Sequence, residues 1–337
     1  MKNQAPSRKR PPKTLLGMPP ILKDLLPLML GVFSGEARAI LPLSQSPFGE
    51  FLRQSRLTPW LYRQVTQHGW EDYLTTDLLK DLRQDYILEL MAASRQEQEI
   101  YKVIGALVQA GITLILLKGA DLRLRLYGDP AVRPMRDLDL LIAFEDLDRA
   151  QQALIDLGYR IYPTYKELRP GFRQRAGNAI HYVPPPDSHL LVDLHWEIAV
   201  ILDFYRLPYA FLRQKAIPLQ YQGLPVYVLS PEHTLIHLCL HLYHHFPLVT
   251  QTLDLALALV SLPVDWAKFL KEAARFKCQR PVYLMLQEVA PLLPQAPPPE
   301  VMASLARYRP SFMERAVLHR RLGSLTLGIP WGRKTGA

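Results

Sequence analysis

A short apolar segment that carries two acids places the strongest constraint on how this chain folds. DLDLLIAF spans residues 137–144 and has Asp137 and Asp139 at its start. Its apolar run predicts a buried β-strand, in which residues two apart point to the same face. Two carboxylates on one face repel each other, and this repulsion costs stability unless a cation lies between them. Their charge is then balanced by a bound cation or by the arginines just ahead of the strand, Arg133 and Arg136, or it is removed by protonation.

A second predicted strand has the same character. HLLVDLHWEI, residues 189–198, alternates so that Asp193 and His195 share the polar face. Asp193 therefore joins Asp137 and Asp139 as a candidate ligand of an oxygen-lined Mg²⁺ or Mn²⁺ site, which substrate phosphates would complete. The alternative is a solvated sheet edge with local arginine partners. His195 would orient a metal ligand or contact phosphate in the first case and be a surface imidazole in the second.

The order of predicted elements indicates an α/β fold, with a small mixed sheet between helical segments. ITLILLKG (112–119) predicts a strand that ends at a glycine, and the acid-led run 145–158 predicts an amphipathic helix. Helical spacing dominates before this core and again after a predicted hairpin. We expect a basic disordered tail over 1–13, a helical region over 14–110, the core over 111–215 and a mainly helical domain over 216–337.

Composition limits the classes of partner. Apolar residues make up 49% of the chain and charged residues 21%, as in a globular protein. More than half of the net charge of +9 lies in residues 1–13, so the charge allows nucleic acid as a partner without favouring it. Two cysteines give no disulfide framework, and no apolar run suits a membrane span or signal peptide. We expect a soluble, cytoplasmic protein with no membrane partner.

Four motifs in a fixed order resemble a known family. They are LLKGADLRLRLYGDPAVRPMRDLDLLI, LVDLHWEI, LSPEHTLIHLCLHLYHH and TLDLALAL. They are similar to an uncharacterised, nucleotidyltransferase-like family of bacterial proteins within the polymerase-β superfamily, and the resemblance covers residues 110–290. The ordered set is far more specific than the Asp-x-Asp motif alone.

The resemblance implies transfer of a nucleoside monophosphate from a nucleoside triphosphate to an acceptor hydroxyl, with Mg²⁺ or Mn²⁺ and release of pyrophosphate. It implies that the catalytic residues and metal ligands are Asp137, Asp139 and Asp193. The groups that it implies for the nucleotide are Lys118, Gly119, Arg133 and Arg136, and we add His195 as a candidate. The acceptor, whether a small molecule, a peptide or a protein, does not follow from the resemblance.

One departure from the superfamily pattern concerns the start of the helix after the first core strand. The superfamily usually has Gly-Ser or Gly-Gly there, whereas this chain has Lys118-Gly119-Ala120. Backbone amides at a helix start still bind anions, and we expect Lys118 to supply the charge. The missing hydroxyl keeps a second hypothesis open, namely a non-catalytic nucleotide-binding or interaction module that retained the fold.

Histidines recur every fourth residue on the helix predicted after Ser230. They are His233, His237, His241 and His245. This spacing can present imidazoles to zinc, but neither an HExxH glutamate nor a cysteine pair completes a site. We expect one or two of these histidines to line the nucleotide cleft and the others to be structural.

Overall fold

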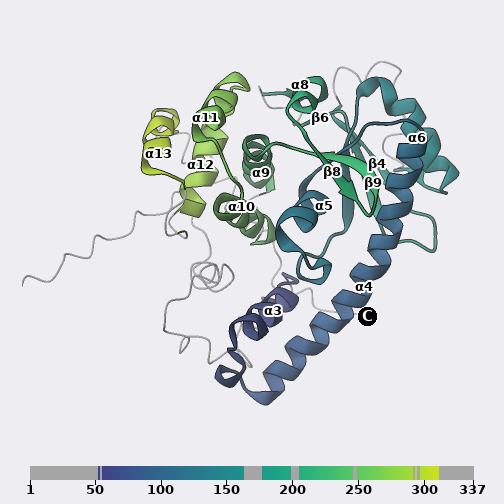
Figure 1. Cartoon of the computed structure of the whole chain (residues 1–337). Helices are drawn as coiled ribbons and strands as arrows, with labels where there is room; N and C mark the ends of the chain where they lie inside the picture. Colours follow the sequence, from purple (N-terminus) through teal and green to yellow (C-terminus); the bar gives the residue numbers. More distant parts are fainter. Residues whose placement is uncertain are drawn as a thin grey trace, which may run out of the picture.

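The computed structural model describes residues 52–310, except 54, 163–176, 199–204, 246–248, 291–292 and 294–296. A mixed sheet and its covering helices form one side of the molecule, and a cluster of C-terminal helices forms the other (Figure 1). The predicted α/β class is confirmed. The predicted basic tail over 1–13 lies outside the described residues.

The helices and strands follow one another in mixed order along the chain. The helices are α3 (Thr58–His68), α4 (Thr76–Gln109), α5 (Lys118–Leu122), α6 (Leu147–Asp156), α8 (Tyr209–Gln214), α9 (Pro231–His245), α10 (Val249–Ser261), α11 (Trp266–Arg275), α12 (Gln279–Val289) and α13 (Pro299–Leu305). The strands are β1 (Ile115–Leu116), β2 (Asp137–Leu141), β3 (Arg160–Ile161), β4 (Ala179–Val183), β5 (Leu191–His195), β6 (Glu197–Ile198), β7 (Leu207–Pro208), β8 (Ile217–Tyr221) and β9 (Leu224–Val228).

The main sheet has seven strands in the order β3-β4-β5-β2-β1-β9-β8. β2 and β5 run parallel at its centre, and β1 and β9 also pair in parallel, while the other pairs are antiparallel. β6 and β7 form a separate antiparallel pair. The two strands that carry the predicted acids are therefore direct neighbours in the middle of the sheet.

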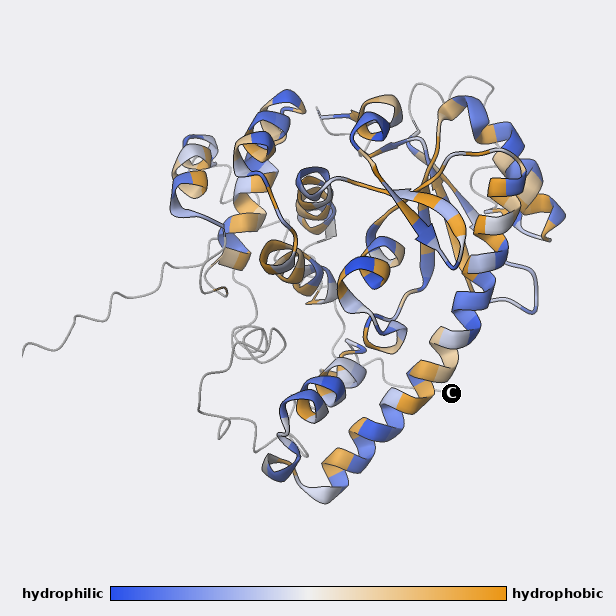
Figure 2. Cartoon of the chain, in the orientation of Figure 1, coloured by the Kyte–Doolittle hydropathy of each residue, from blue (hydrophilic) through white to orange (hydrophobic). Residues whose placement is uncertain are grey.

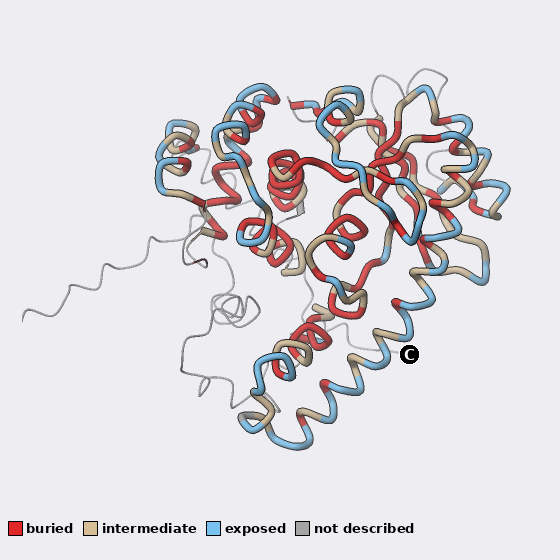
Figure 3. Tube along the Cα trace, in the orientation of Figure 1, coloured by how far each residue is buried: buried red, intermediate tan, exposed pale blue. Residues whose placement is uncertain are grey.

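The two faces of the sheet have different coverings. One face packs Leu138 and Leu140 of β2 against the apolar sides of α4 and α6. The opposite face presents Leu141 to a second core, which the C-terminal helices α9, α10 and α12 share with α3. Hydrophilic and hydrophobic residues alternate along α4 (Figure 2). Buried residues run from the central strands into α9, while the N-terminal part of α4 has much exposed surface (Figure 3). The predicted acids lie on the second face, because β-strand residues alternate between faces.

Several predicted boundaries differ from the structure. The first core strand is shorter than predicted over 112–119, because α5 already begins at Lys118. The predicted hairpin over 216–230 forms β8 and β9, and β9 pairs with β1. The sheet therefore extends past residue 215, where we expected the core to end.

The helix after this hairpin begins as its sequence predicts. The hydroxyl of Ser230 accepts a hydrogen bond from the backbone N–H of His233 at 3.3 Å, and Pro231 is the first residue of α9. A serine cap followed by proline is typical of a helix start, where backbone N–H groups have no intrahelical partner.

Candidate active site

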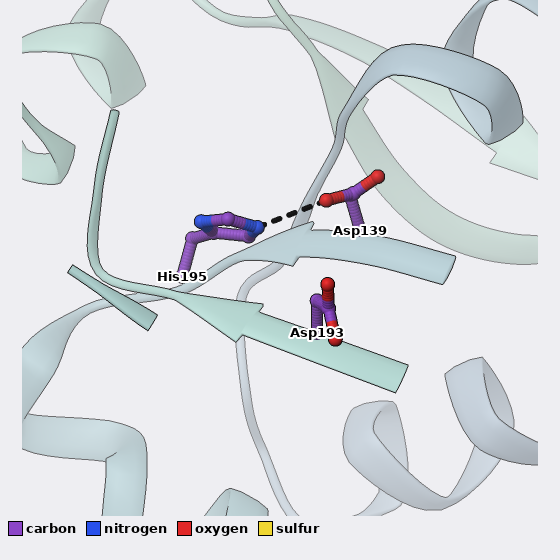
Figure 4. Close-up of side chains that lie close together, drawn as sticks. All are labelled: Asp139, Asp193 and His195. Carbon is purple, nitrogen blue, oxygen red and sulfur yellow. Dashed lines mark hydrogen bonds and ion pairs between the residues drawn. The ribbon is translucent and has the colours of Figure 1, made fainter. Parts of the chain in front are cut away.

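Asp139 and Asp193 lie side by side at the centre of the sheet. They are paired in register on the parallel strands β2 and β5. His195, two residues beyond Asp193, points to the same face and brings its Nε2 to 2.9 Å from Asp139 Oδ1 (Figure 4). One ligand atom from each of these three residues lies within 4.8 Å of the others.

Lys118 reaches this group from the start of α5. Its Nζ donates a hydrogen bond to Asp139 Oδ1 at 2.6 Å, and only 16% of the lysine side chain is exposed. Its backbone has φ of 44°, a left-handed conformation that is uncommon outside glycine and costs about 1–3 kcal/mol. Backbone strain of this kind is often retained at functional sites, which favours a functional role for this lysine.

The charge on Asp139 is therefore balanced by side chains of the protein itself. Burial alone would raise the pKa of Asp139, but Lys118 and His195 together hold it well below its usual range. Burial likewise acts to lower the pKa of Lys118, and Asp139 outweighs that effect and raises it. A bound cation is thus not the only group that can balance these carboxylates, and the side chains that pair with Asp139 are Lys118 and His195, not the arginines just ahead of the strand.

Asp193 has a second imidazole as its neighbour. His181 of β4 lies opposite Asp193 in the antiparallel register, and its Nδ1 is 2.6 Å from Asp193 Oδ1. This hydrogen bond raises the pKa of His181, whose side chain is 40% exposed. No motif in the sequence indicates His181, although its place in the strand AIHYV puts it on the polar face.

Asp137 and Arg136 lie at the beginning of β2, closer to solvent. Asp137 is partly buried, and burial together with the nearby charge of Asp139 raises its pKa. Arg136 is exposed. Asp137 is thus the acid on this strand whose charge is poorly balanced, as we expected for the whole group.

Arg133 forms a buried ion pair away from the three convergent ligands. Its Nε and Nη2 donate to the two carboxylate oxygens of Asp254 on α10, at 2.8 and 2.7 Å. Tyr127 donates to the same carboxylate at 2.6 Å. This geometry favours a structural role for Arg133, in joining the segment before β2 to the C-terminal helices, and we do not include it in the proposed nucleotide site.

Gly119 is buried under Met135. A Cβ atom added at Gly119 would lie 2.8 Å from Cγ of Met135 and 2.9 Å from its Sδ. The close approach of α5 to the loop before β2 therefore explains a glycine here by packing. The predicted contact of its backbone amide with triphosphate stays a prediction.

His237 of α9 interacts electrostatically with three residues of the site, namely Lys118, Asp139 and His195. It is buried, and burial, Lys118 and His195 lower its pKa to about 3, against the opposing effect of Asp139. His233 is also buried and lies 3.4 Å from Glu272. Among the described residues, the α9 histidines form no convergent metal-type cluster. We retain the prediction that one of them, His237, lines the site.

The lowered pKa of His237 predicts a pH dependence of stability in the metal-free protein. A histidine is protonated below about pH 6.5 in the unfolded chain, but His237 stays neutral in the folded protein down to about pH 3. The unfolded state then binds the extra proton, so acidification through this range destabilises the fold by up to about 1.4 kcal/mol per pH unit. His237→Gln should remove this part of the slope in denaturant titrations at several pH values.

An exposed histidine supplies the control for this measurement. His189 is exposed, and His189→Gln should leave the slope close to that of the unmodified protein. An equal slope in the His237→Gln protein and in the unmodified protein would contradict the buried, neutral state of His237.

The convergent residues fit a divalent metal ion by the chemistry of their donor atoms. Asp139 and Asp193 offer carboxylate oxygens from adjacent strands, and His195 offers an imidazole nitrogen within the same 4.8 Å group. Carboxylates suit Mg²⁺ and Mn²⁺, and imidazole suits transition metals. Asp137, two residues before Asp139 on the same face, lies at the edge of this group.

A mixed sheet with aspartates on two adjacent central strands, and a helix that starts beside them, is the arrangement that the resemblance implies. The chain belongs to the family described as "Uncharacterised nucleotidyltransferase", whose family model matches residues 44–294. The predicted family is confirmed. No curated protein matches the chain.

Solved structures with a similar fold include two of the antibiotic-resistance factor ANT(2'')-Ia. Its solution structure shares 19% identity, over 55% of this chain and 94% of that chain, with a TM-score of 0.40. Its crystal structure with adenylyl-2''-tobramycin shares 17%, over 54% and 97%, with a TM-score of 0.39. An antigenic nucleotidyltransferase-like protein from Paracoccidioides brasiliensis shares 18%, over 60% and 92%, with a TM-score of 0.31. These likenesses are remote.

In the part of the chain that the structure describes, no helix combines the length and the apolar character needed to cross a bilayer.

Proposed function

We propose that this protein transfers a nucleoside monophosphate from a nucleoside triphosphate to an acceptor hydroxyl in the cytoplasm, with a divalent metal ion. The observation that carries the proposal is the register pairing of Asp139 with Asp193, in a chain of this family. Two carboxylates at the centre of a sheet are costly for the fold, and a metal-dependent reaction gives a reason to keep them.

The reaction assigns a separate task to each group. The acceptor oxygen attacks the α-phosphorus, the bond from the α-phosphorus to the bridging oxygen breaks, and pyrophosphate leaves. Asp193 accepts the proton of the acceptor hydroxyl, because its carboxylate lies beside Asp139 and only partly buried. Asp139 and Asp193, with Asp137 beside them on β2, would hold the metal ion, which would supply positive charge to the phosphates. Lys118 and the exposed Arg136 attract the leaving phosphates.

The test is a search for product with unmodified protein. Each of the four α-labelled ribonucleoside triphosphates would be incubated with Mg²⁺ or Mn²⁺ and with pooled acceptors from three classes: small hydroxyl compounds, peptides and proteins. We expect stoichiometric pyrophosphate and an acceptor whose mass increases by one nucleoside monophosphate. Nucleotide binding without either product, for every acceptor class, would contradict transfer.

A second candidate function is a nucleotide-binding or interaction module without catalysis. The ion pair of Lys118 with Asp139 favours it, because an internal ammonium already balances the charge of a predicted metal ligand. The two candidates differ in what happens when that lysine is removed.

Lys118→Met is expected to lower turnover by roughly a hundredfold, as does the loss of one group that stabilises charge in a transition state. Charge on the leaving pyrophosphate develops during the reaction, so nucleotide affinity should change much less. The measurement is a pair of values, kcat from pyrophosphate release and Kd from calorimetry. Lys102→Met, at an exposed lysine of α4, is the control. Full turnover in the Lys118→Met protein would contradict the assigned task of Lys118.

A further inference from the structure

The group of metal-type side chains at the sheet centre contains a nitrogen donor. Asp139, Asp193 and His195 form the convergent group among the described residues, so a histidine joins two of the three predicted aspartates. Figure 4 shows the imidazole of His195 turned toward Asp139 above the two central strands. A site built for Mg²⁺ alone would be expected to have oxygen donors only.

Pairing of β5 with β2 fixes the position of His195. It follows Asp193 by two residues on β5, and its backbone lies opposite Leu141 of β2 in the parallel register. Its side chain is 13% exposed. An imidazole held by a central strand in this way loses little additional conformational entropy when it binds an ion.

The donor atoms of the group already face one another. His195 Nε2 and Asp139 Oδ1 form a hydrogen bond at 2.9 Å, and the ligand atoms of all three residues lie within 4.8 Å of one another. An ion that replaces this hydrogen bond would therefore meet both side chains without a change of strand position. Lys118 Nζ contacts the same oxygen, so a dication bound there displaces the ammonium or shares Asp139 with it.

We infer that His195 is a direct metal ligand, and that the site therefore takes a first-row transition dication such as Mn²⁺ in preference to Mg²⁺. This inference rests on the proposed function, since it names the metal class of the same site. Imidazole binds first-row transition ions better than it binds Mg²⁺, which requires hard oxygen ligands and keeps its waters.

The neighbouring histidine is a built-in control. His181 lies on the same face of the sheet, one strand further out, with its Nδ1 2.6 Å from Asp193 Oδ1. It is outside the convergent group of three residues. His181 therefore positions Asp193 from outside the ligand set, whereas His195 belongs to the set.

The experiment measures the metal directly, without turnover. Mn²⁺ is titrated into the full chain and followed by electron paramagnetic resonance, and the bound ion is examined for coupling to a directly coordinated imidazole nitrogen by electron spin echo spectroscopy. We expect this coupling in the unmodified protein, with a change of isotope pattern after labelling with ¹⁵N-histidine. His195→Gln should remove the coupling and weaken Mn²⁺ binding by at least the roughly tenfold loss seen when an outer partner of a ligand is removed.

The same titration with Mg²⁺ as competitor gives the preference between the two metals. His195→Gln replaces a nitrogen donor by an amide oxygen, so Mg²⁺ should compete better in this variant than in the unmodified protein. His181→Gln should retain the nitrogen coupling. Bound Mn²⁺ without nitrogen coupling in the unmodified protein would overturn the inference, even if His195→Gln failed to fold. So would coupling that is lost in His181→Gln and retained in His195→Gln.

The outcomes also separate this inference from the proposed function. Pyrophosphate release with bound Mn²⁺ that shows no nitrogen coupling leaves the transfer reaction in place and removes His195 as a ligand. Nitrogen coupling in a protein that transfers nothing leaves the metal site in place and removes the reaction. A protein that binds neither Mn²⁺ nor Mg²⁺, with or without nucleotide, contradicts both.

Discussion

Asp139→Asn is expected to abolish nucleotidyl transfer and, at the same time, to destabilise the metal-free protein. The first effect follows from its place beside Asp193, where it would hold the metal. Loss of several kcal/mol of charge stabilisation corresponds to a fall in rate of about a thousandfold or more. Pyrophosphate release under saturating nucleotide and metal measures it.

The second effect follows from the partners of Asp139. The side chain is 3% exposed and contacts both Lys118 and His195. Asp139→Asn leaves the buried ammonium of Lys118 without its carboxylate, which costs about 3 kcal/mol when a buried pair is broken. The free energy of unfolding of the metal-free protein, from denaturant titration, should fall by about this amount.

Two further variants separate stability from catalysis. Lys118→Met combined with Asp139→Asn removes the unpaired charge, so it should recover most of the lost stability and remain inactive. Burial and the charge of Asp139 raise the pKa of the Asp137 carboxyl, so its charge is unfavourable in the folded state. Asp137→Asn removes this charge, and the metal-free protein should melt at the same or a higher temperature. An Asp139→Asn protein as stable as the unmodified one would show that the ion pair with Lys118 contributes nothing in solution.

The α/β fold and the face of the strands on which the acids lie could largely be predicted from the sequence. The alternation of apolar and polar residues in DLDLLIAF and LVDLH predicts two strands with Asp139 and Asp193 on their polar faces, and both strands are present. That the acids lie opposite each other depends on the register of β2 and β5, which no local pattern encodes.

The ionic partners could not be predicted, because neighbours in sequence are often not neighbours in space. Arg133 is four residues from Asp137, yet it pairs with Asp254, 121 positions further along the chain. Lys118, which we predict to hold phosphate, has its ammonium on Asp139 and a left-handed backbone, and neither feature is indicated by the sequence around it. Left-handed backbone at a lysine has no sequence signal, since such positions usually carry glycine.

The pairing of Arg133 with Asp254 leads to the second large effect. Arg133 and Asp254 have side chains that are 12% and 2% exposed, and the guanidinium binds both carboxylate oxygens. Asp254 opposes the effect of burial and raises the pKa of Arg133, so the arginine remains charged. Asp254→Ala should therefore lower the free energy of unfolding by about 3–5 kcal/mol, because it leaves a buried cation without a partner.

A surface pair gives the scale for comparison. Asp146 and Arg149 form an ion pair in which the arginine side chain is 57% exposed. Asp146→Ala should cost no more than about 1 kcal/mol, as is usual for exposed pairs. Equal losses in Asp146→Ala and Asp254→Ala would contradict the buried ion pair.

Replacement of both partners decides whether Arg133 acts on the fold or on the nucleotide. Arg133→Met combined with Asp254→Leu removes both charges and fills their space with apolar groups, so it should recover much of the stability that Asp254→Ala loses. If Arg133 only joins the segment before β2 to α10, this double variant binds nucleotide nearly as tightly as the unmodified protein. A stable double variant whose nucleotide affinity falls about tenfold, or 1.4 kcal/mol, would instead return Arg133 to the triphosphate site that the resemblance implied. Calorimetry with nucleotide and Mn²⁺ gives the nucleotide affinity of the unmodified protein and of the double variant. Denaturant titration of the same two proteins gives their stability, so a loss of affinity can be told from a loss of folded protein.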